Sequence, residues 1–126
     1  MTDRYFSIQT FDSTFKWTSK EIVNVTGYTC EEMLGKNPYS YFHKDDLKRI
    51  VNKHMNALGI VHDCKIQDLK YRWKHKNGKF IWCQVYFVKY EDGLTCLTRK
   101  LKLSEIINFK IHLMIQDIKL YTQLFL

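Results

Sequence analysis

Hydrophobic and polar residues alternate along the second half of the chain. Between residues 70 and 76 the even positions are all basic, whereas the odd positions hold Tyr71, Trp73 and His75. In residues 80–90 the two alternating sets are Ile81, Cys83, Val85, Phe87 and Trp82, Gln84, Tyr86, Val88. Because successive residues of a strand point to opposite faces, this pattern predicts two strands with Tyr71, Trp73 and the Cys83 set facing inward.

Turn signals join these strands to a third. Asn77-Gly78 and Asp92-Gly93 are typical of tight hairpins, and a further β-like run at 94–103 follows the second turn. The second half is therefore predicted to form a three-stranded antiparallel meander. Near the N-terminus, two short runs of β-forming residues, 4–9 and 14–18, predict two more strands.

Short helices are expected between residues 19 and 59. Gly27 and Gly35 can end two of them, and the longest follows Asp45-Asp46, whose carboxylates suit the positive end of a helix dipole. Its stripe, spaced by three and four residues, is Leu47, Ile50, Val51, His54 and Leu58. The order of elements predicts an α+β domain with helices over one face of a five-stranded antiparallel sheet.

The last part of the chain, 103–126, predicts one more helix, with Ser104 at its start. Its apolar positions recur at alternating spacings of four and three, as in a coiled coil or helix-packing face: Ile107, Ile111, Met114, Ile118, Tyr121 and Phe125. We therefore divide the chain into a domain at 1–103 and an amphipathic helix at 104–126. We expect the helix to dock on its own domain, on a partner, or on both.

Composition limits the class of protein. The chain has 126 residues, 45% hydrophobic and 26% charged, which fits one globular domain. Its formal net charge of +7 attracts polyanions but identifies no partner. Four cysteines without a C-x-x-C pair, and no export signal, favour reduced thiols in an intracellular protein. Because Lys110, His112, Asp117 and Lys119 interrupt the apolar C-terminal stretch, we expect no membrane span.

Three stretches carry a family resemblance: Val25-Thr-Gly-Tyr-Thr-Cys-Glu-Glu-Met-Leu-Gly35, Tyr41-Phe-His-Lys-Asp-Asp-Leu47 and Lys70-Tyr-Arg-Trp-Lys-His-Lys-Asn-Gly-Lys-Phe-Ile-Trp82. Their order and spacing resemble a PAS domain of the PAS-fold-3 group. Within that group, the pattern most resembles the second PAS repeat of bHLH-PAS regulators of the hypoxia-inducible-factor and clock type. The resemblance implies a PAS fold and a sensory or protein-interaction module in signalling or transcription regulation, not an enzyme. It is also the sole basis for preferring the nucleus over the cytoplasm.

The resemblance further implies an internal pocket between the long helix and the sheet. The positions that match cavity-lining sites are Phe15, Phe42, Ile50, His54, Tyr71, Trp73, Cys83, Val85 and Thr98. The alternation independently turns most of them inward, and an apolar pocket with few polar groups suits a small ligand. The alternative is a filled core, because Tyr71 and Trp73 are bulky enough to occupy such a space.

No cofactor is predicted. A histidine at position 54 can be a haem ligand in some PAS domains, but it also matches regulators that bind no haem. A flavin is disfavoured because Pro38 stands where the reactive cysteine would be. The nearest metal-like clusters, His62-Asp63-Cys64 and His43 with Asp45-Asp46, lack four-ligand spacing. No nucleophile-and-base motif or phosphate-binding loop supports catalysis.

The outer sheet face is the predicted interaction surface. Its apolar members, with the helix positions expected to join them, are Trp82, Tyr86, Leu97, Leu101, Ile107, Ile111, Met114 and Ile118. So much apolar surface indicates dimerisation with a second copy or another protein. The basic row Lys70, Arg72, Lys74, Lys76 and Lys79 is expected to be solvated. Direct binding of nucleic acid is the weaker alternative, because the aromatic residues between these side chains face inward.

Overall fold

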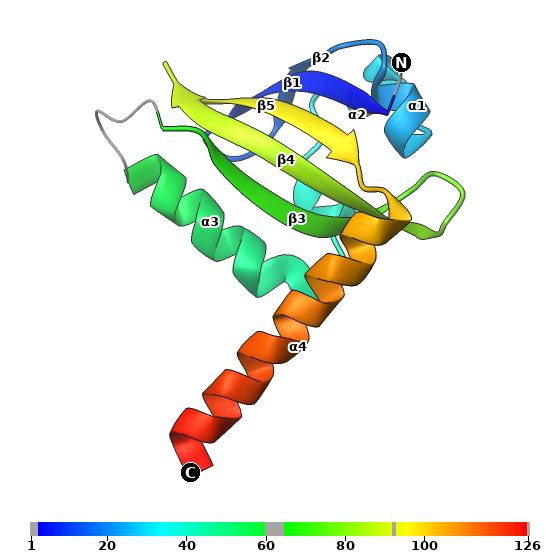
Figure 1. Ribbon diagram of the computed structural model, residues 1–126. Coiled ribbons are helices and arrows are strands. Elements are labelled where there is room, and N and C mark those ends of the chain that lie inside the picture. The colour runs from blue at the N-terminus through cyan, green and yellow to red at the C-terminus, as the bar shows by residue number, and fades with distance from the viewer. Residues whose placement is uncertain (1–2, 60–64, 92, 126) are drawn as a thin grey trace.

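The computed structural model describes residues 3–59, 65–91 and 93–125 (Figure 1). The strands are β1 (Arg4–Thr10), β2 (Phe15–Thr18), β3 (Gln67–Lys74), β4 (Phe80–Tyr90) and β5 (Gly93–Lys100). The helices are α1 (Ile22–Thr26), α2 (Cys30–Met33), the 3₁₀ turns η1 (Pro38–Tyr41) and η2 (Lys44–Asp46), α3 (Leu47–Gly59) and α4 (Leu103–Phe125). The predicted α+β order of elements is confirmed.

The strands form one antiparallel sheet in the order β2-β1-β5-β4-β3. The predicted meander is confirmed, because β4 pairs with both β3 and β5. Of the second turn signal, Asp92 lies outside the described residues. β1 pairs with β5 along its whole length, from Arg4 opposite Arg99 to Thr10 opposite Gly93. The first and last strands of the domain are therefore neighbours near the middle of the sheet.

The predicted strand register is also confirmed. Tyr71, Trp73 and Cys83 are 5%, 2% and 1% exposed, whereas the basic residues between the aromatic ones lie on the other face. Residues of α1, α2 and α3, such as Ile22, Met33 and Ile50, belong to the same buried cluster as the inward side chains of the sheet. The core thus lies between these helices and one face of the sheet, which we call the inner face.

Local signals explain the short helices. Gly27 ends α1 in a left-handed conformation with φ of +80°, and a Cβ there would lie 2.6 Å from Cε1 of His75, so glycine is needed for two reasons. Thr29 begins α2 with a capping box, in which its side chain accepts from the backbone N–H of Glu32 and the Glu32 carboxylate accepts from that of Thr29. These caps let helices of a single turn form where the chain must change direction.

Asp46 fastens the start of α3 to the edge strand β3. Its carboxylate is 1% exposed and accepts hydrogen bonds from the backbone N–H of Arg72 at 2.7 Å and from the Arg72 guanidinium at 2.8 and 3.1 Å. Arg49 lies 3.3 Å from the same carboxylate. Burial opposes ionisation, but the bonds from Arg72 outweigh it and hold the pKa of Asp46 below 3.8. The expectation that Arg72 belongs to a solvated row is therefore wrong.

Glu105 holds the first turn of α4 against the sheet. Its carboxylate pairs with both terminal nitrogens of Arg99 and accepts from the backbone N–H of Lys102 at 2.9 Å. These bonds, the one from Arg99 first, lower the pKa of Glu105 to about 2. A bidentate pair between β5 and α4 sets the direction in which the helix leaves the domain.

Phe109 makes the second attachment of α4. Its ring contacts that of Trp82 on β4, with centroids 5.6 Å apart, and the cationic groups of Arg49 and Lys70 each lie 5.4 Å from its centroid. After Phe109 the helix projects away from the domain (Figure 1), and of residues 110–125 only Leu113 is half-buried. None of the helices within the described ranges has the length and hydropathy that a membrane crossing requires.

Candidate functional site

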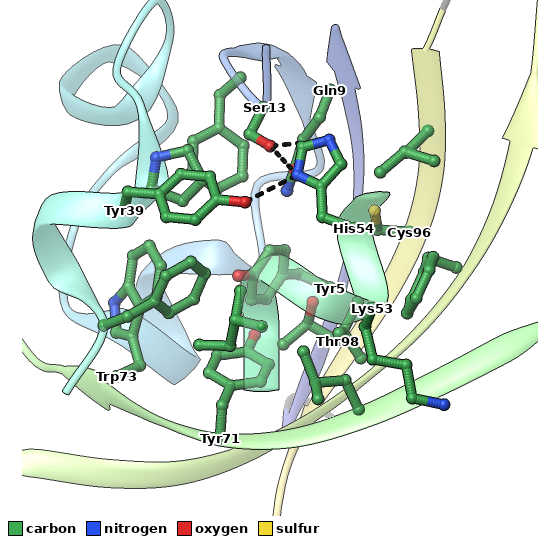
Figure 2. A pocket seen from close by; sticks show the side chains of 18 residues that line it. Tyr5, Gln9, Ser13, Tyr39, Lys53, His54, Tyr71, Trp73, Cys96 and Thr98 are labelled. Carbon is green, nitrogen blue, oxygen red and sulfur yellow. Dashed lines mark hydrogen bonds between the residues drawn. The ribbon is translucent and has the colours of Figure 1, made fainter. Parts of the chain in front are cut away.

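A cavity of about 60 Å³ lies in the core, with walls from α3, η1 and the inner face of the sheet (Figure 2). Eight of the nine predicted pocket residues line it: Phe15, Phe42, Ile50, His54, Tyr71, Trp73, Val85 and Thr98. Cys83 does not; it is buried in the core cluster, opposite Tyr71 in the strand pairing. The interior is a packed core with a residual cavity, because Tyr71 and Trp73 are themselves buried in it.

Sequence reasoning missed several lining residues, among them Tyr5, Ser13, Tyr39 and Cys96. Tyr5 and Cys96 could have been found by extending the alternation argument to β1 and the start of β5, where buried and more exposed residues also alternate. Ser13 and Tyr39 lie in a turn and in η1, where no periodicity exists. Their position depends on how those segments fold over the cavity.

His54 forms a polar end of the cavity with Ser13 and Tyr39 (Figure 2). The hydroxyl oxygens of Ser13 and Tyr39 each lie 2.8 Å from Nδ1 of His54, and Nε2 lies 3.0 Å from the carbonyl oxygen of Phe11. A carbonyl can only accept, so Nε2 carries a proton, and in the neutral ring Nδ1 accepts from the hydroxyls. This cluster ties α3 to η1 and to the turn between β1 and β2.

The same geometry bears on haem. Both nitrogens of His54 are engaged within the protein, so neither has a lone pair directed at an iron. The cavity of about 60 Å³ is also several times smaller than the roughly 300–1,000 Å³ typical of small-molecule sites. The residues present therefore do not fit haem. A ligand compatible with this cavity is limited to a few non-hydrogen atoms.

Buried hydroxyl and thiol groups also line the cavity, among its apolar side chains. Burial raises the pKa of Tyr71 well above 10 and that of Tyr5 as well, so both phenols stay protonated and can donate a hydrogen bond. Burial likewise raises the pKa of Cys96 to about 12. A thiol in this state is a poor nucleophile. These phenol and thiol groups therefore present neutral polar atoms to the cavity.

The outer face of the sheet carries an exposed apolar patch. Phe6, Ile8 and Trp17 are 52%, 38% and 48% exposed. Cross-strand pairing places Phe6 beside Leu97, and Ile8 beside Trp17 on one side and Thr95 on the other. Thr95 is in turn paired with Val88. We call Phe6, Ile8, Trp17, Val88 and Leu97 the sheet patch. β1 and β2 supply three of its five members, which the sequence-based choice of surface residues missed.

Two of the four predicted sheet residues are covered by the chain itself. Leu101 is 4% exposed, and its assignment to an accessible face is therefore wrong. Trp82 is half-buried between the Phe109 ring and the Arg72 guanidinium, which lies 4.9 Å from a Trp82 ring centroid. The start of α4 thus covers one end of the outer face, and the sheet patch lies beyond it.

A polar network separates the two ends of the outer face. Gln84 is 5% exposed, donates to Asp68 at 2.7 Å and accepts from Arg99 at 2.8 Å and from the hydroxyl of Tyr86 at 3.1 Å. Tyr86, the third predicted sheet residue, is half-buried in this network, and the fourth, Leu97, lies in the sheet patch. The network supplies hydrogen-bond partners for the buried side chain of Gln84.

The apolar positions of α4 do not cover the sheet of their own chain. The exposed fractions of Ile107, Ile111, Met114, Ile118, Tyr121 and Phe125 run from 45% to 67%. We call these six residues the helix seam. The half-buried residues of the helix are instead Glu105, Ile106, Phe109 and Leu113. Docking of the seam on its own domain, one of the expected arrangements, is therefore wrong.

Metal ligands do not gather in the described ranges. Among residues 3–59, 65–91 and 93–125, no three histidine, cysteine, aspartate or glutamate side chains are placed to hold a metal ion. His43 and Asp45 approach each other at 3.8 Å but have no third partner of this kind there. The other sequence cluster, His62-Asp63-Cys64, lies outside the described residues.

Comparison with known families agrees with this geometry. A family model described as PAS fold matches residues 15–97. The chain belongs to the PAS family. Among solved structures, the PAS-B domain of Drosophila melanogaster Cycle with bound ethylene glycol has a TM-score of 0.66 and 17% identity, covering 77% of this chain and 97% of that one. A PAS domain of an HTR-like protein from Haloarcula marismortui has a TM-score of 0.64 and 15% identity, covering 78% and 86%.

Curated relatives point to the bHLH-PAS regulators. The chain is 31% identical over 77 residues to human Basic helix-loop-helix ARNT-like protein 1, covering 61% of this chain and 12% of that protein. It is 26% identical over 83 residues to Hypoxia-inducible factor 1-alpha of Oncorhynchus mykiss, covering 66% and 10%. The chain therefore spans about a tenth of the length of these relatives. Over the matched residues it is similar to part of these bHLH-PAS regulators.

Proposed function

We propose that this PAS domain is an interaction module that dimerises through the outer sheet face and α4, in intracellular signalling or transcription regulation. The observation that carries the proposal is the pair of unpartnered apolar surfaces. Phe6 and Trp17 are about half exposed on the sheet, and Ile118 is 58% exposed on the helix. Surfaces of this kind are typical of binding sites. The relationship to bHLH-PAS regulators supports the same function.

The energetics favour burial of both surfaces. At about 25 cal/mol per Å², covering a few hundred Å² of apolar area stabilises a complex by several kcal/mol. Part of this gain offsets the entropy lost on association. The polar groups at the edge of the sheet patch do not oppose burial, because Gln84, Arg99 and Glu105 already satisfy one another.

The test uses sedimentation equilibrium to compare a variant in the sheet patch with a control variant on α3. We expect the full chain to self-associate, or to associate with a bHLH-PAS partner supplied in the sample. Trp17→Lys places a charge in the sheet patch and should weaken association at least tenfold. Val51→Lys changes a residue that is 41% exposed on α3 and belongs to neither the sheet patch nor the helix seam, and it should leave association unchanged. A full chain that stays monomeric with and without partner contradicts the proposal.

A second candidate function, sensing of a small molecule in the cavity, is favoured by the buried donors. Tyr71 and Thr98 line the cavity, and burial keeps the Tyr71 phenol protonated. The related Cycle PAS-B structures contain ethylene glycol or, in a W398A variant, glycerol. By similarity, we propose a neutral polar ligand of that size here.

Nuclear magnetic resonance titration with ethylene glycol and glycerol tests this candidate. Saturable shifts should concentrate on methyl groups around the cavity, such as those of Ile50 and Val85. Thr98→Leu removes a hydroxyl and fills the space, and should abolish the saturable shifts. The matched control, Thr95→Leu, changes the same residue type on the opposite face of β5. Linear shifts spread over the surface would contradict a specific site.

A further inference from the structure

A hollow lies on the outer face of the sheet, between residues of β1, β2, β4 and β5. It has a volume of about 260 Å³ and lies at the end of the sheet opposite the start of α4. Its walls include Ile8, Trp17, Tyr90 and Thr95. Trp17 and Tyr90 are 48% and 65% exposed, so two aromatic side chains flank an open space of the size of a large side chain or two.

Gly93 explains why the hollow exists. It lies in the lining at the start of β5, where a Cβ would be 2.1 Å from the carbonyl oxygen of Gln9 on the neighbouring strand. A side chain is therefore sterically excluded at this position, and the surface between Trp17 and Tyr90 stays open. The hollow continues into the sheet patch through Ile8 and Trp17, which belong to both.

The last turns of α4 carry exposed apolar side chains that could fill such a space. Tyr121, Leu124 and Phe125 are 60%, 66% and 67% exposed, and Tyr121 and Phe125 contact each other with ring centroids 4.8 Å apart. Within one chain they cannot reach the hollow. The Arg99–Glu105 pair and the Phe109 contacts direct α4 away from the sheet, and its C-terminal end lies far from the turn between β4 and β5 (Figure 1).

The charges of α4 fit a second copy. Residues 103–125 hold Glu105, Lys110, Asp117 and Lys119, so the helix has no formal net charge, and the chain's +7 resides on the domain. Two domains of this charge repel each other when they approach directly. A neutral helix can approach a basic domain without that penalty, whereas direct docking of the two domains cannot avoid it.

The available area fits as well. The aromatic members of both surfaces have about 150–250 Å² each and are roughly half exposed. With the aliphatic members, the helix seam and the sheet patch together offer on the order of 800 Å² per chain. That is the area each partner buries in a dimer of standard size. A twofold arrangement uses both surfaces of both copies.

We propose, building on the dimerising function above, that the hollow is the docking site for the C-terminal end of α4 from a second copy of this chain. In this arrangement the helix seam of each protomer lies across the sheet patch of the other. Tyr121 and Phe125 occupy the space between Trp17 and Tyr90, and the exchange is reciprocal. The anchor at Glu105 sets the angle at which each helix crosses.

Sedimentation equilibrium of two single variants and their controls tests the arrangement. Trp17→Lys changes the hollow and Tyr121→Lys changes the helix end, so each should weaken self-association at least tenfold. Gln116→Lys, on the side of the helix away from the seam, and Val51→Lys on α3 should leave it unchanged. Circular dichroism of each variant checks that the fold is kept.

The pattern of loss separates this inference from the proposed function. If Tyr121→Lys alone dissociates the dimer, the helices pair with each other, and if Trp17→Lys alone does so, the sheets pair. Either result overturns the exchange but keeps a dimerising module. A wild-type chain that is monomeric alone but binds a bHLH-PAS partner also overturns it and keeps the function. A chain that associates with neither overturns both.

Disulfide cross-linking between engineered cysteines tests directly whether the helix end of one chain lies in the hollow of another. One chain carries Thr95→Cys in the hollow and the other Leu124→Cys at the helix end. Under mild oxidation the mixture should form a disulfide-linked heterodimer, in excess over the wild-type chain treated identically. The Leu124→Cys chain alone should form little. Efficient self-linking of that chain, without linkage in the mixture, contradicts the exchange.

Discussion

The two faces of the sheet differ in how far their apolar side chains are covered by the rest of the chain. On the inner face, Tyr71 and Trp73 are covered by helices from the same chain and are at most 5% exposed. On the outer face the start of α4 contacts Trp82 through Phe109, whereas Phe6 and Trp17 stay about half exposed. Strand alternation thus creates two apolar faces, and this chain closes one of them.

The polar groups of the two faces also differ in charge. Inside, the uncharged hydroxyl groups of Ser13 and Tyr39 bond to Nδ1 of His54. At the β3 edge and on the outer face, the polar contacts include two ion pairs, Asp46 with Arg72 and Glu105 with Arg99. Buried neutral groups hold the interior in one arrangement. The ion pairs fix the positions of α3 and α4 against the sheet.

The largest expected effect contrasts two tryptophans. Trp73→Ala removes a side chain that is 2% exposed and should lower the free energy of unfolding by about 3–5 kcal/mol. Trp17→Ala on the outer face should lower it by less than about 1 kcal/mol in dilute monomer. Urea unfolding followed by circular dichroism measures both. Equal losses would mean that the outer face is part of the core.

Trp73 also allows the ring and the indole N–H to be compared. Within the described residues, Nε1 of Trp73 has no hydrogen-bond partner although it is buried. Trp73→Phe removes this unpaired donor and keeps most of the ring, so its cost should be well below that of Trp73→Ala. A Phe variant as unstable as the Ala variant would show that the indole N–H has a bonding role.

The second prediction concerns the ion pair at the edge of the sheet. Asp46→Asn should lower the free energy of unfolding by about 1–3 kcal/mol, since charge-assisted hydrogen bonds to Arg72 are lost. Asp45→Asn, whose side chain is 64% exposed, should change it little. Chemical unfolding of the two variants under identical conditions gives the comparison.

The pH dependence of the same pair has a defined sign. The folded-state pKa of Asp46 lies below the ordinary 3.8, so its contribution is fully present above that value and is lost as pH falls through the folded pKa. The stability difference between wild type and Asp46→Asn should therefore shrink below about pH 4. A difference that grows on acidification contradicts the assignment.

The third prediction separates strain from hydrogen bonding at Ser13. This residue is 3% exposed with φ of 70°, and its hydroxyl contacts His54. Ser13→Ala loses the hydroxyl and keeps a left-handed backbone that alanine disfavours, and should cost about 1–2 kcal/mol. Ser13→Gly relieves the backbone and should be less destabilising by about 0.5–1 kcal/mol. Thermal unfolding ranks the two; the reverse order would contradict the role of the backbone.

The smallest global effect is expected at the anchor of α4. Glu105→Gln should change the free energy of unfolding by less than about 1 kcal/mol, because the pair with Arg99 is partly exposed. Locally, hydrogen exchange of the first turns of α4 should accelerate. Asp117→Asn, further along the exposed helix, is the control and should leave this exchange unchanged.

Acid should accelerate hydrogen exchange of the first turns of α4 in the wild type, as Glu105→Gln does. Since the pKa of Glu105 is about 2 rather than 4.5, its contribution is present above pH 4.5 and is lost between about pH 4.5 and 2. The difference in exchange between wild type and Glu105→Gln should therefore vanish at the acid end of this range. A difference that persists there would assign the anchoring to contacts other than the carboxylate.

Much of the fold could be predicted because strand and helix periods are local. The alternation of Tyr71 and Trp73 with basic residues predicted the faces of β3, and the spacing of Ile107 and Ile111 predicted α4. The proposed surface was predicted less well. Trp82 and Leu101 were chosen because they alternate correctly, but whether an outward residue stays exposed depends on the path of α4.

The amino-acid sequence by itself determined which residues form strands and helices, which face of each strand is apolar, and the PAS family. These follow from periodicity, caps and turn residues, whose effects extend over a few neighbours. Only the tertiary structure decided that β1 lies beside β5, that Ser13 and Tyr39 meet His54, and that α4 leaves the sheet patch uncovered. Those features depend on contacts between residues far apart in the chain, such as Arg4 opposite Arg99, which local patterns do not encode.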